Sequence, residues 1–360
     1  MMRYVIAAVF FITSVWFSNP TVNATEASLQ EYGNKVIATA LSRLKVQPDD
    51  DNLACLTNAG YVTYNGQDTF LFIDLLTQKT HISLGRGNLL QVHTVSDEPL
   101  FFAFVQKKSS KELLLTYLKV TDQKIHATEP LNVYVDINQS FEKFTTVLGE
   151  KSFAVVTIAN GWADGVPWDL MQGALWHDHL CCGVFSGYFT INFIRQNFPL
   201  KEKEQYYYIG APAWCQDDYI TRALNLTPGK HGYYTMAYPW SRPWTTAEKT
   251  YAQLGGIIIQ FNSATQSGKA HLLQFNWCEE DFKEYLGMPK LELNWGKDRW
   301  LHVCYNRFFI KHLNKPEKFV SILKTKALKK TQDLNRLIDL GANPLEEILG
   351  VDENWIPERE

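Results

Sequence analysis

Seven residues near the middle of the chain, HDHLCCG at positions 177–183, concentrate side chains that bind metals. His177, His179 and Cys181 stand at every second position, and imidazole and thiolate are the usual protein ligands of zinc and other borderline-soft metal ions. If this run is extended, the three side chains point to the same side of the chain. The segment therefore predicts a metal site, and the alternative is a polar turn that is merely rich in histidine and cysteine.

Two predicted helices would position these side chains. The segment GVFSGYFTINFIRQN (183–197) is apolar on nearly every side and predicts a buried helix directly after the HDHLCCG run. The segment APAWCQDDYITRALNL (211–226) predicts a second helix, with Cys215 and Asp218 near its start. A helix start stabilises a thiolate through its free N–H groups and its dipole, so both places suit a cysteine ligand.

The residues alone leave three interpretations of this site open. Cys215 would complete a four-ligand set with the first motif, or three protein ligands plus water would make an open, reactive site. A disulfide between Cys215 and either Cys181 or Cys182 is the third interpretation. Asp218 either caps its helix or supports a ligand from behind.

These motifs resemble those of a known family. WHDHLCCGVFSGY is similar to the H-x-H-x-C-x-G segment of the formylmethanofuran dehydrogenase E-subunit family, and CQDDYI (215–220) to its Cys-x-x-Asp-x-Ile segment. NLTPGKHG (225–232) resembles the Gly-Lys turn that follows. LTNAGYVTYNG and GRGNLLQVH resemble the N-terminal half of longer, exported two-domain relatives, so the resemblance covers most of residues 50–280.

The resemblance implies an α+β domain that binds a metal ion, with zinc expected and other transition metals also suited to the donors. The ligands carried over are His177, His179, Cys181 and Cys215. It also implies that Asp218 and Lys230 line the same cleft and contact a bound cofactor, and it implies no catalytic residue. The family usually has proline where this chain has Cys182, which leaves open whether that thiol is a further ligand or a disulfide partner.

The rest of the chain predicts a duplicated α+β fold. A length of 360 residues favours two domains. Two predicted hairpins, 101–120 and 257–277, each follow a glycine-rich turn, GRGN (85–88) and PGKHG (228–232). We therefore expect two similar α+β domains, related by a degenerate duplication, with a helical C-terminal tail.

The expected boundaries follow from these segments. They are a signal peptide (1–24), an N-terminal domain without a metal cluster (25–150), a metal-binding domain (151–290) and a C-terminal helical extension (291–360). Within them, 26–46 and 317–349 have the spacing of amphipathic helices.

The N-terminus has the pattern of a secretory signal. Arg3 precedes an apolar stretch of 14 residues from Tyr4 to Phe17, and Val22-Asn23-Ala24 is a small-residue cleavage site. The stretch is short for a spanning helix, which needs about 20 apolar residues. We expect a mature chain that begins at Thr25, has no stable membrane anchor, and is periplasmic or extracellular.

The net charge of the chain limits the kinds of molecule that it is expected to bind. A formal net charge of -3 gives no basic surface for nucleic acid. The expected ligands are a small molecule or a metal-containing cofactor, and the sequence is compatible with a homodimer. The favoured function is an exported metal-binding protein that supports metal, cofactor or redox-enzyme handling. The alternatives are a zinc enzyme that activates water, and a two-domain solute-binding module with a structural metal.

Overall fold

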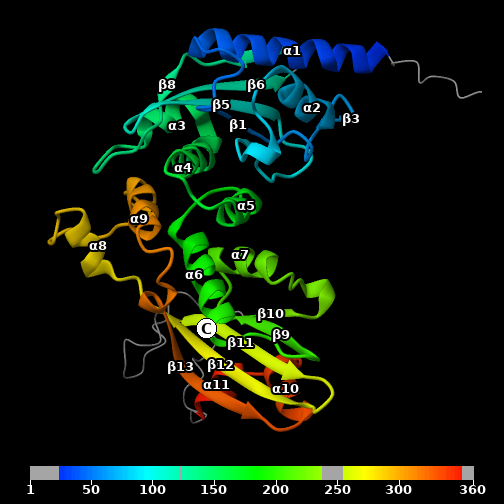
Figure 1. The fold of residues 1–360 in the computed structure, drawn as a ribbon, viewed down its shortest axis with the longest axis vertical. Helices are drawn as coiled ribbons and strands as arrows, with labels where there is room; N and C mark the ends of the chain where they lie inside the picture. Colours follow the sequence, from blue (N-terminus) through cyan, green and yellow to red (C-terminus); the bar gives the residue numbers. More distant parts are fainter. Residues whose placement is uncertain (1–23, 122–123, 237–253, 351–360) are drawn as a thin grey trace, which may run out of the picture.

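A computed structural model describes residues 24–121, 124–236 and 254–350 (Figure 1). The first half of the chain forms a six-stranded sheet in the order β4-β1-β5-β6-β7, with β8 paired to β6. Its strands are β1 (Leu53–Thr57), β4 (Leu89–Gln91), β5 (Leu100–Ser109), β6 (Glu112–Thr121), β7 (Lys124–Ala127) and β8 (Leu131–Asn132). A two-stranded ribbon, β2 (Thr63–Tyr64) and β3 (Gln67–Asp68), lies apart from this sheet.

The second half forms a five-stranded sheet in the order β10-β9-β11-β12-β13. Its strands are β9 (Glu204–Gly210), β10 (Tyr233–Thr235), β11 (Leu254–Asn262), β12 (Ser267–Phe275) and β13 (Val320–Leu328). Strands β9, β11 and β12 each have runs of buried β-branched, aromatic or leucine side chains, which favour a pleated, packed surface.

The helices form layers above, between and below the two sheets (Figure 1). Two cover the outer face of the first sheet, α1 (Ala24–Leu44) and α2 (Phe70–Lys79). Two cover the outer face of the second sheet, α10 (Thr331–Ile338) and α11 (Pro344–Leu349). The central layer contains α3 (Glu142–Leu148), α4 (Ser152–Ala163), α5 (Trp168–Trp176), α6 (Cys182–Asn197), α7 (Cys215–Ala223), α8 (Glu279–Tyr285) and α9 (Trp300–Ile310).

The two sheets share one topology. In the first, β1 leads through α2 and a 3₁₀ turn, η1 (Leu84–Arg86), to β4, which pairs with β1 in parallel. In the second, β9 leads through α7 and the turn η3 (Pro228–Lys230) to β10, again in parallel. An antiparallel hairpin then follows on the other side of the first strand, β5–β6 and β11–β12 respectively. The structure therefore agrees with the α+β class and with the repeated hairpins predicted from the sequence.

Even the glycine-rich turns correspond. Each 3₁₀ turn ends in a left-handed residue, Gly87 with φ 69° and His231 with φ 54°. This equivalence explains why GRGN and PGKHG precede the hairpins at the same place in each half. Glycine adopts this backbone at little cost, whereas a histidine there is uncommon.

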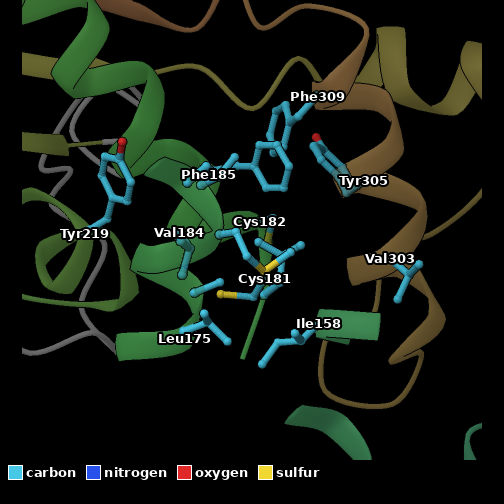
Figure 2. Packing of buried hydrophobic residues seen from close by; sticks show 14 of the residues in the cluster. Ile158, Leu175, Cys181, Cys182, Val184, Phe185, Tyr219, Val303, Tyr305 and Phe309 are labelled. Carbon is cyan, nitrogen blue, oxygen red and sulfur yellow. The ribbon is translucent and has the colours of Figure 1, made fainter. Parts of the chain in front are cut away.

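One hydrophobic core runs through the central layer and joins both halves. It contains Leu56 and Phe101 from the first sheet and Tyr208 and Phe275 from the second. Figure 2 shows part of this core, where side chains of α6 such as Phe185 pack against α9. Cys181 and Cys182 lie inside this packed region, so the start of α6 is firmly placed.

The C-terminal region differs from the sequence prediction in one element. The prediction of helix over 317–349 is wrong for 320–328, which form β13 against β12, while α10 and α11 are helical as expected. The spacing of the lysines imitates a helical face, but Val320, Ile322 and Thr325 are β-branched and favour a strand. The segment forms a strand because the edge of β12 offers backbone hydrogen bonds to it.

Other predictions lie outside what the structure tests. The predicted signal peptide lies almost wholly in residues 1–23, outside the described residues, and the domain boundaries at 150 and 290 stay predictions. None of the helices in the described part of the chain is both long enough and apolar enough to cross a membrane.

Candidate metal centre

The HDHLCCG run is a bend between two helices rather than an extended segment. His177 caps the C-terminus of α5, and Cys181 is the extended residue at the N-cap of α6. Between them Asp178 takes a left-handed conformation with φ 72°. The expectation that alternation along a strand aligns the ligands is therefore wrong, and the reversal at Asp178 is what turns both histidines to one side.

Close contact between α6 and α7 brings the second cysteine to the first motif. Cys215 is the first residue of α7, as the sequence predicted. A Cβ on Gly183 would lie 2.6 Å from the Cβ of Cys215, and a Cβ on Gly187 would lie 2.6 Å from the carbonyl oxygen of Gln216. Real Cβ contacts are longer, so two glycines on one face of α6 permit the approach.

The four predicted ligands meet at this point. Among the described residues, one donor atom from each of His177, His179, Cys181 and Cys215 lies within 4.8 Å of all the others. In a tetrahedral zinc site with Zn–N of about 2.0 Å and Zn–S of about 2.3 Å, donor atoms lie roughly 3.3–3.8 Å apart. A His/Cys cluster of the size that suits a metal ion is therefore present, and an ion would draw it together by about 1 Å.

Two carboxylates orient the histidines. Nδ1 of His177 donates a hydrogen bond to Oδ2 of Asp218 at 2.6 Å, and Nδ1 of His179 donates to Oδ1 of Asp178 at 2.6 Å. This leaves each Nε2 atom for the cluster, and Nε2 of His177 is buried without a hydrogen-bond partner. A carboxylate behind a histidine is the usual support of a metal ligand, and a metal ion would satisfy the unpaired nitrogen.

Asp217, and not Asp218, caps the start of α7. Oδ2 of Asp217 accepts a hydrogen bond from the backbone N–H of Trp214 at 2.9 Å, which closes the start of α7. Asp217 is 3% exposed, and burial raises the pKa of its carboxyl to about 7. Asp218 is thereby free to face His177.

Within the cluster, neighbouring groups shift the pKa values of His177 and Cys215 in opposite directions. Burial alone lowers the pKa of His177, but the Asp218 carboxylate and the Cys215 sulfur outweigh it and raise the pKa to about 9. The Cys181 thiol donates to Cys215 and, with the two histidines, holds the pKa of Cys215 far below its usual range. This shift favours the thiolate of Cys215, and a divalent ion would displace the protons of its neighbours.

Cys182 does not join the cluster. Its sulfur lies 3.7 Å from Nδ1 of His302, on α9, and all six cysteines of the chain are free thiols. Burial raises the pKa of Cys182 to about 12 and lowers the pKa of His302 to about 4. Both groups are thus neutral near pH 7.

Lys230 is exposed at the end of η3, where its ammonium donates to the side chain of Asn225. Among the described residues no hydrogen bond joins Lys230 to the four donors, so its role in ligand binding stays a prediction. Of the other cysteines, Cys55 and Cys304 are buried and Cys278 is partly buried.

Sequence reasoning missed two residues at this site. Asp178 supports His179, and its place between the two histidines was a signal that could have shown this. His302 contacts Cys182 across 120 residues of sequence, and no local pattern could have placed it there.

Comparison with known proteins agrees with this geometry. Residues 176–290 match the FmdE family, described as "molybdenum formylmethanofuran dehydrogenase operon". The match begins directly before His177 and includes all four cluster residues. No curated protein matches the chain.

Proposed function

Because residues 176–290 belong to the FmdE family, the formylmethanofuran dehydrogenase E-subunit family that the sequence motifs resemble, we propose that this is an exported zinc-binding protein. It handles a metal ion or a metal-containing cofactor in support of a redox enzyme. One observation carries the proposal: two imidazole and two thiol donors lie within 4.8 Å of one another. The support role rests on the family description, which refers to the operon of a molybdenum enzyme.

Zinc is the ion we propose for this donor set. Two imidazoles and two thiolates form a tetrahedral, borderline-soft site, which zinc fills without a redox change. His177, His179, Cys181 and Cys215 would hold the ion. Export would bring the site to its cofactor outside the cytoplasm, and a mature N-terminus at Thr25, measured by mass spectrometry, tests that part.

Four protein ligands favour binding over hydrolysis. A catalytic zinc usually keeps one position for water, whereas a closed set of four does not. The side chains of His177 and His179 are 13% and 22% exposed, so solvent reaches the site's edge. That exposure is the observation in favour of a second candidate, a zinc enzyme in which one histidine leaves the ion to water.

Metal analysis with thiol titration, on protein purified without oxygen or chelator, tests the proposal. We expect one zinc per chain, a sharp loss with Cys215→Ser, and little change with Cys182→Ser. In the disulfide interpretation, wild type would hold no metal, Cys215 would already be oxidised, and Cys215→Ser would cost about 2–4 kcal/mol of stability. That result would overturn the proposal.

The hydrogen bond from His177 to Asp218 can be tested by the zinc affinity of a variant at Asp218. Asp218→Asn removes the carboxylate behind a ligand and should weaken zinc binding about 10–100-fold. Asp281→Asn is the matched control, because Asp281 is 53% exposed and pairs with Lys318, much as the 52% exposed Asp218 pairs with His177. Equal zinc affinities in the two variants would argue against the role given to Asp218.

A separate measurement distinguishes the second candidate function. A cobalt-substituted protein with a five-coordinate spectrum would favour the zinc enzyme over the closed binding site.

A further inference from the structure

Helix α9 contacts the metal-binding loop on both sides of one ligand. The side-chain amide of Asn306 donates to the carbonyl oxygen of Leu180 at 3.1 Å. Nδ1 of His302 lies 3.7 Å from the sulfur of Cys182. Leu180 and Cys182 are the two neighbours of Cys181, and His302 and Asn306 are one turn apart on the same face of α9.

The contact of Asn306 fixes the backbone of the loop. The N–H of Leu180 donates to Oγ1 of Thr157, on α4, at 3.1 Å, so both polar backbone groups of Leu180 are held from opposite sides. Asn306 is 3% exposed and Thr157 is fully buried. Buried hydrogen bonds of this kind are costly to break, which makes the loop conformation part of the core.

The contact of His302 decides where the second thiol points. Nε2 of His302 lies 3.4 Å from the carbonyl oxygen of Trp295, which assigns the ring proton to Nε2 and leaves Nδ1 as the acceptor. The thiol of Cys182 therefore donates to Nδ1. The rings of Phe153 and Trp295 pack on His302 at 5.2 and 5.3 Å and hold it in place. Cys182 consequently faces α9 rather than the cluster.

We propose that His302 and Asn306 are positioning residues of the metal centre, which lock the loop and select Cys181 instead of the adjacent Cys182 as the ligand. This inference rests on the proposed function. It extends the site beyond the segment that matches the family, because α9 begins at Trp300 and the match ends at residue 290. A chain with two adjacent thiols needs such a device, since either sulfur is chemically able to bind the ion.

Cobalt substitution of the full-length protein tests the selection of the ligand. Each thiolate adds to the sulfur-to-cobalt charge-transfer band, so Cys181→Ser should reduce the band by about half. If His302 restrains Cys182, the double variant Cys181→Ser with His302→Ala should recover most of the band, because Cys182 can then turn to the ion. An unchanged half-intensity band in the double variant would overturn the role of His302.

Zinc competition against a chelator tests the hydrogen bond from Asn306 to Leu180. Asn306→Asp keeps the shape but loses the N–H donor, and it should weaken zinc binding about tenfold and speed release. The matched control is Asn88→Asp in the first half, since Asn88 is 5% exposed and its amide donates to the carbonyl oxygen of Leu53 at 2.9 Å. Equal zinc affinities of the two variants would overturn the role of Asn306.

The proposed function and the positioning role fail differently. Wild-type protein that takes up neither zinc nor cobalt would overturn the proposed function itself. Wild-type protein that binds both, with His302 and Asn306 variants that bind equally well and show an unchanged spectrum, would overturn the positioning role alone. If Asn306→Asp does not fold, the cobalt spectrum of the His302 variants still decides the selection of the ligand.

Discussion

At the scale of single residues, neighbours rather than residue type decide what each histidine does. His177 has a carboxylate at 2.6 Å, and its pKa rises although the ring is largely buried. His271, on β12, has no acidic partner among the described residues; its ring stacks on Phe198 at 4.1 Å and its Nδ1 lies 2.9 Å from Oγ1 of Thr325. Burial lowers the pKa of His271 to about 4.

The lowered pKa of His271 predicts a loss of stability in acid. The unfolded chain takes up a proton at this residue below its usual pKa of about 6.5, whereas the folded chain resists until about pH 4. The contribution of neutral His271 to the free energy of unfolding is therefore fully present above about pH 6.5 and is lost as the pH falls to about 4. At about 1.4 kcal/mol per pH unit it amounts to at most about 3 kcal/mol, less where solvent screens the ring.

Urea unfolding of metal-free protein near pH 7 and near pH 4.5 measures the effect. His271→Phe keeps a ring on Phe198 but has no site for the proton, so its free energy of unfolding should fall less between the two pH values than that of wild type. Equal falls in both proteins would show that His271 is not the source. Because the other titrating groups are common to both, the comparison isolates this residue.

At the scale of elements, the site depends on how closely two helices meet. The starts of α6 and α7 each provide a cysteine, and Gly183 is the one of the two glycines in contact with α7 that faces Cys215. The first half has an equivalent helix pair, in which a Cβ on Gly33 of α1 would lie 2.4 Å from Cδ1 of Leu75 on α2. There the obstacle is the end of a flexible side chain, which can move, whereas at Gly183 it is the Cβ of Cys215.

The difference predicts opposite outcomes for two alanine substitutions. Gly183→Ala should push Cys215 away from Cys181 and reduce zinc affinity at least tenfold, because ligand distances must hold within tenths of an ångström. Gly33→Ala should leave zinc affinity unchanged and alter stability alone. Chelator competition and thermal unfolding of both variants provide the two readouts. Zinc affinity that is equally affected by both changes would contradict this explanation.

Local patterns revealed the elements that carry the ligands, and long-range contacts remained hidden. The helices at 183–197 and 211–226, and both hairpins, were predictable because apolar periodicity and turn residues act over a few positions. The strand at 320–328 was not, since its partner β12 lies about 50 residues earlier. The four ligand candidates followed from residue type and resemblance, but the contact of His302 with Cys182 could not, because 120 residues of sequence separate the two.

At the scale of the whole molecule, the two halves share one core. Arg307 of α9 shows the link: its guanidinium donates to Asp164 at 2.8 Å, to Asn160 at 2.9 Å and to the carbonyl oxygen of Val135 at 2.5 Å. These partners lie at the end of α4 and next to the first sheet. The central layer therefore packs against both sheets through one hydrophobic core.

A shared core predicts a single unfolding transition. Calorimetry of the full chain should show one cooperative peak despite the duplicated topology, because neither sheet can keep its inner face covered alone. Arg307→Leu should lower the midpoint without splitting the peak, since it leaves the partly buried Asp164 without its cationic partner, a loss of about 2 kcal/mol. Two resolved transitions in wild type would contradict the shared core.

The contacts of α9 also bear on the order in which the molecule matures. Asn306 and His302 follow the residues that they hold by 126 and 120 positions. A growing chain has emerged far enough to supply all four donors well before α9 is synthesised. The loop then lacks its final restraint, and a metal captured at that stage sits in an exchangeable site. In the positioning role proposed for α9, lasting occupancy would begin when α9 docks, so the ion retained would be the one available where that step takes place.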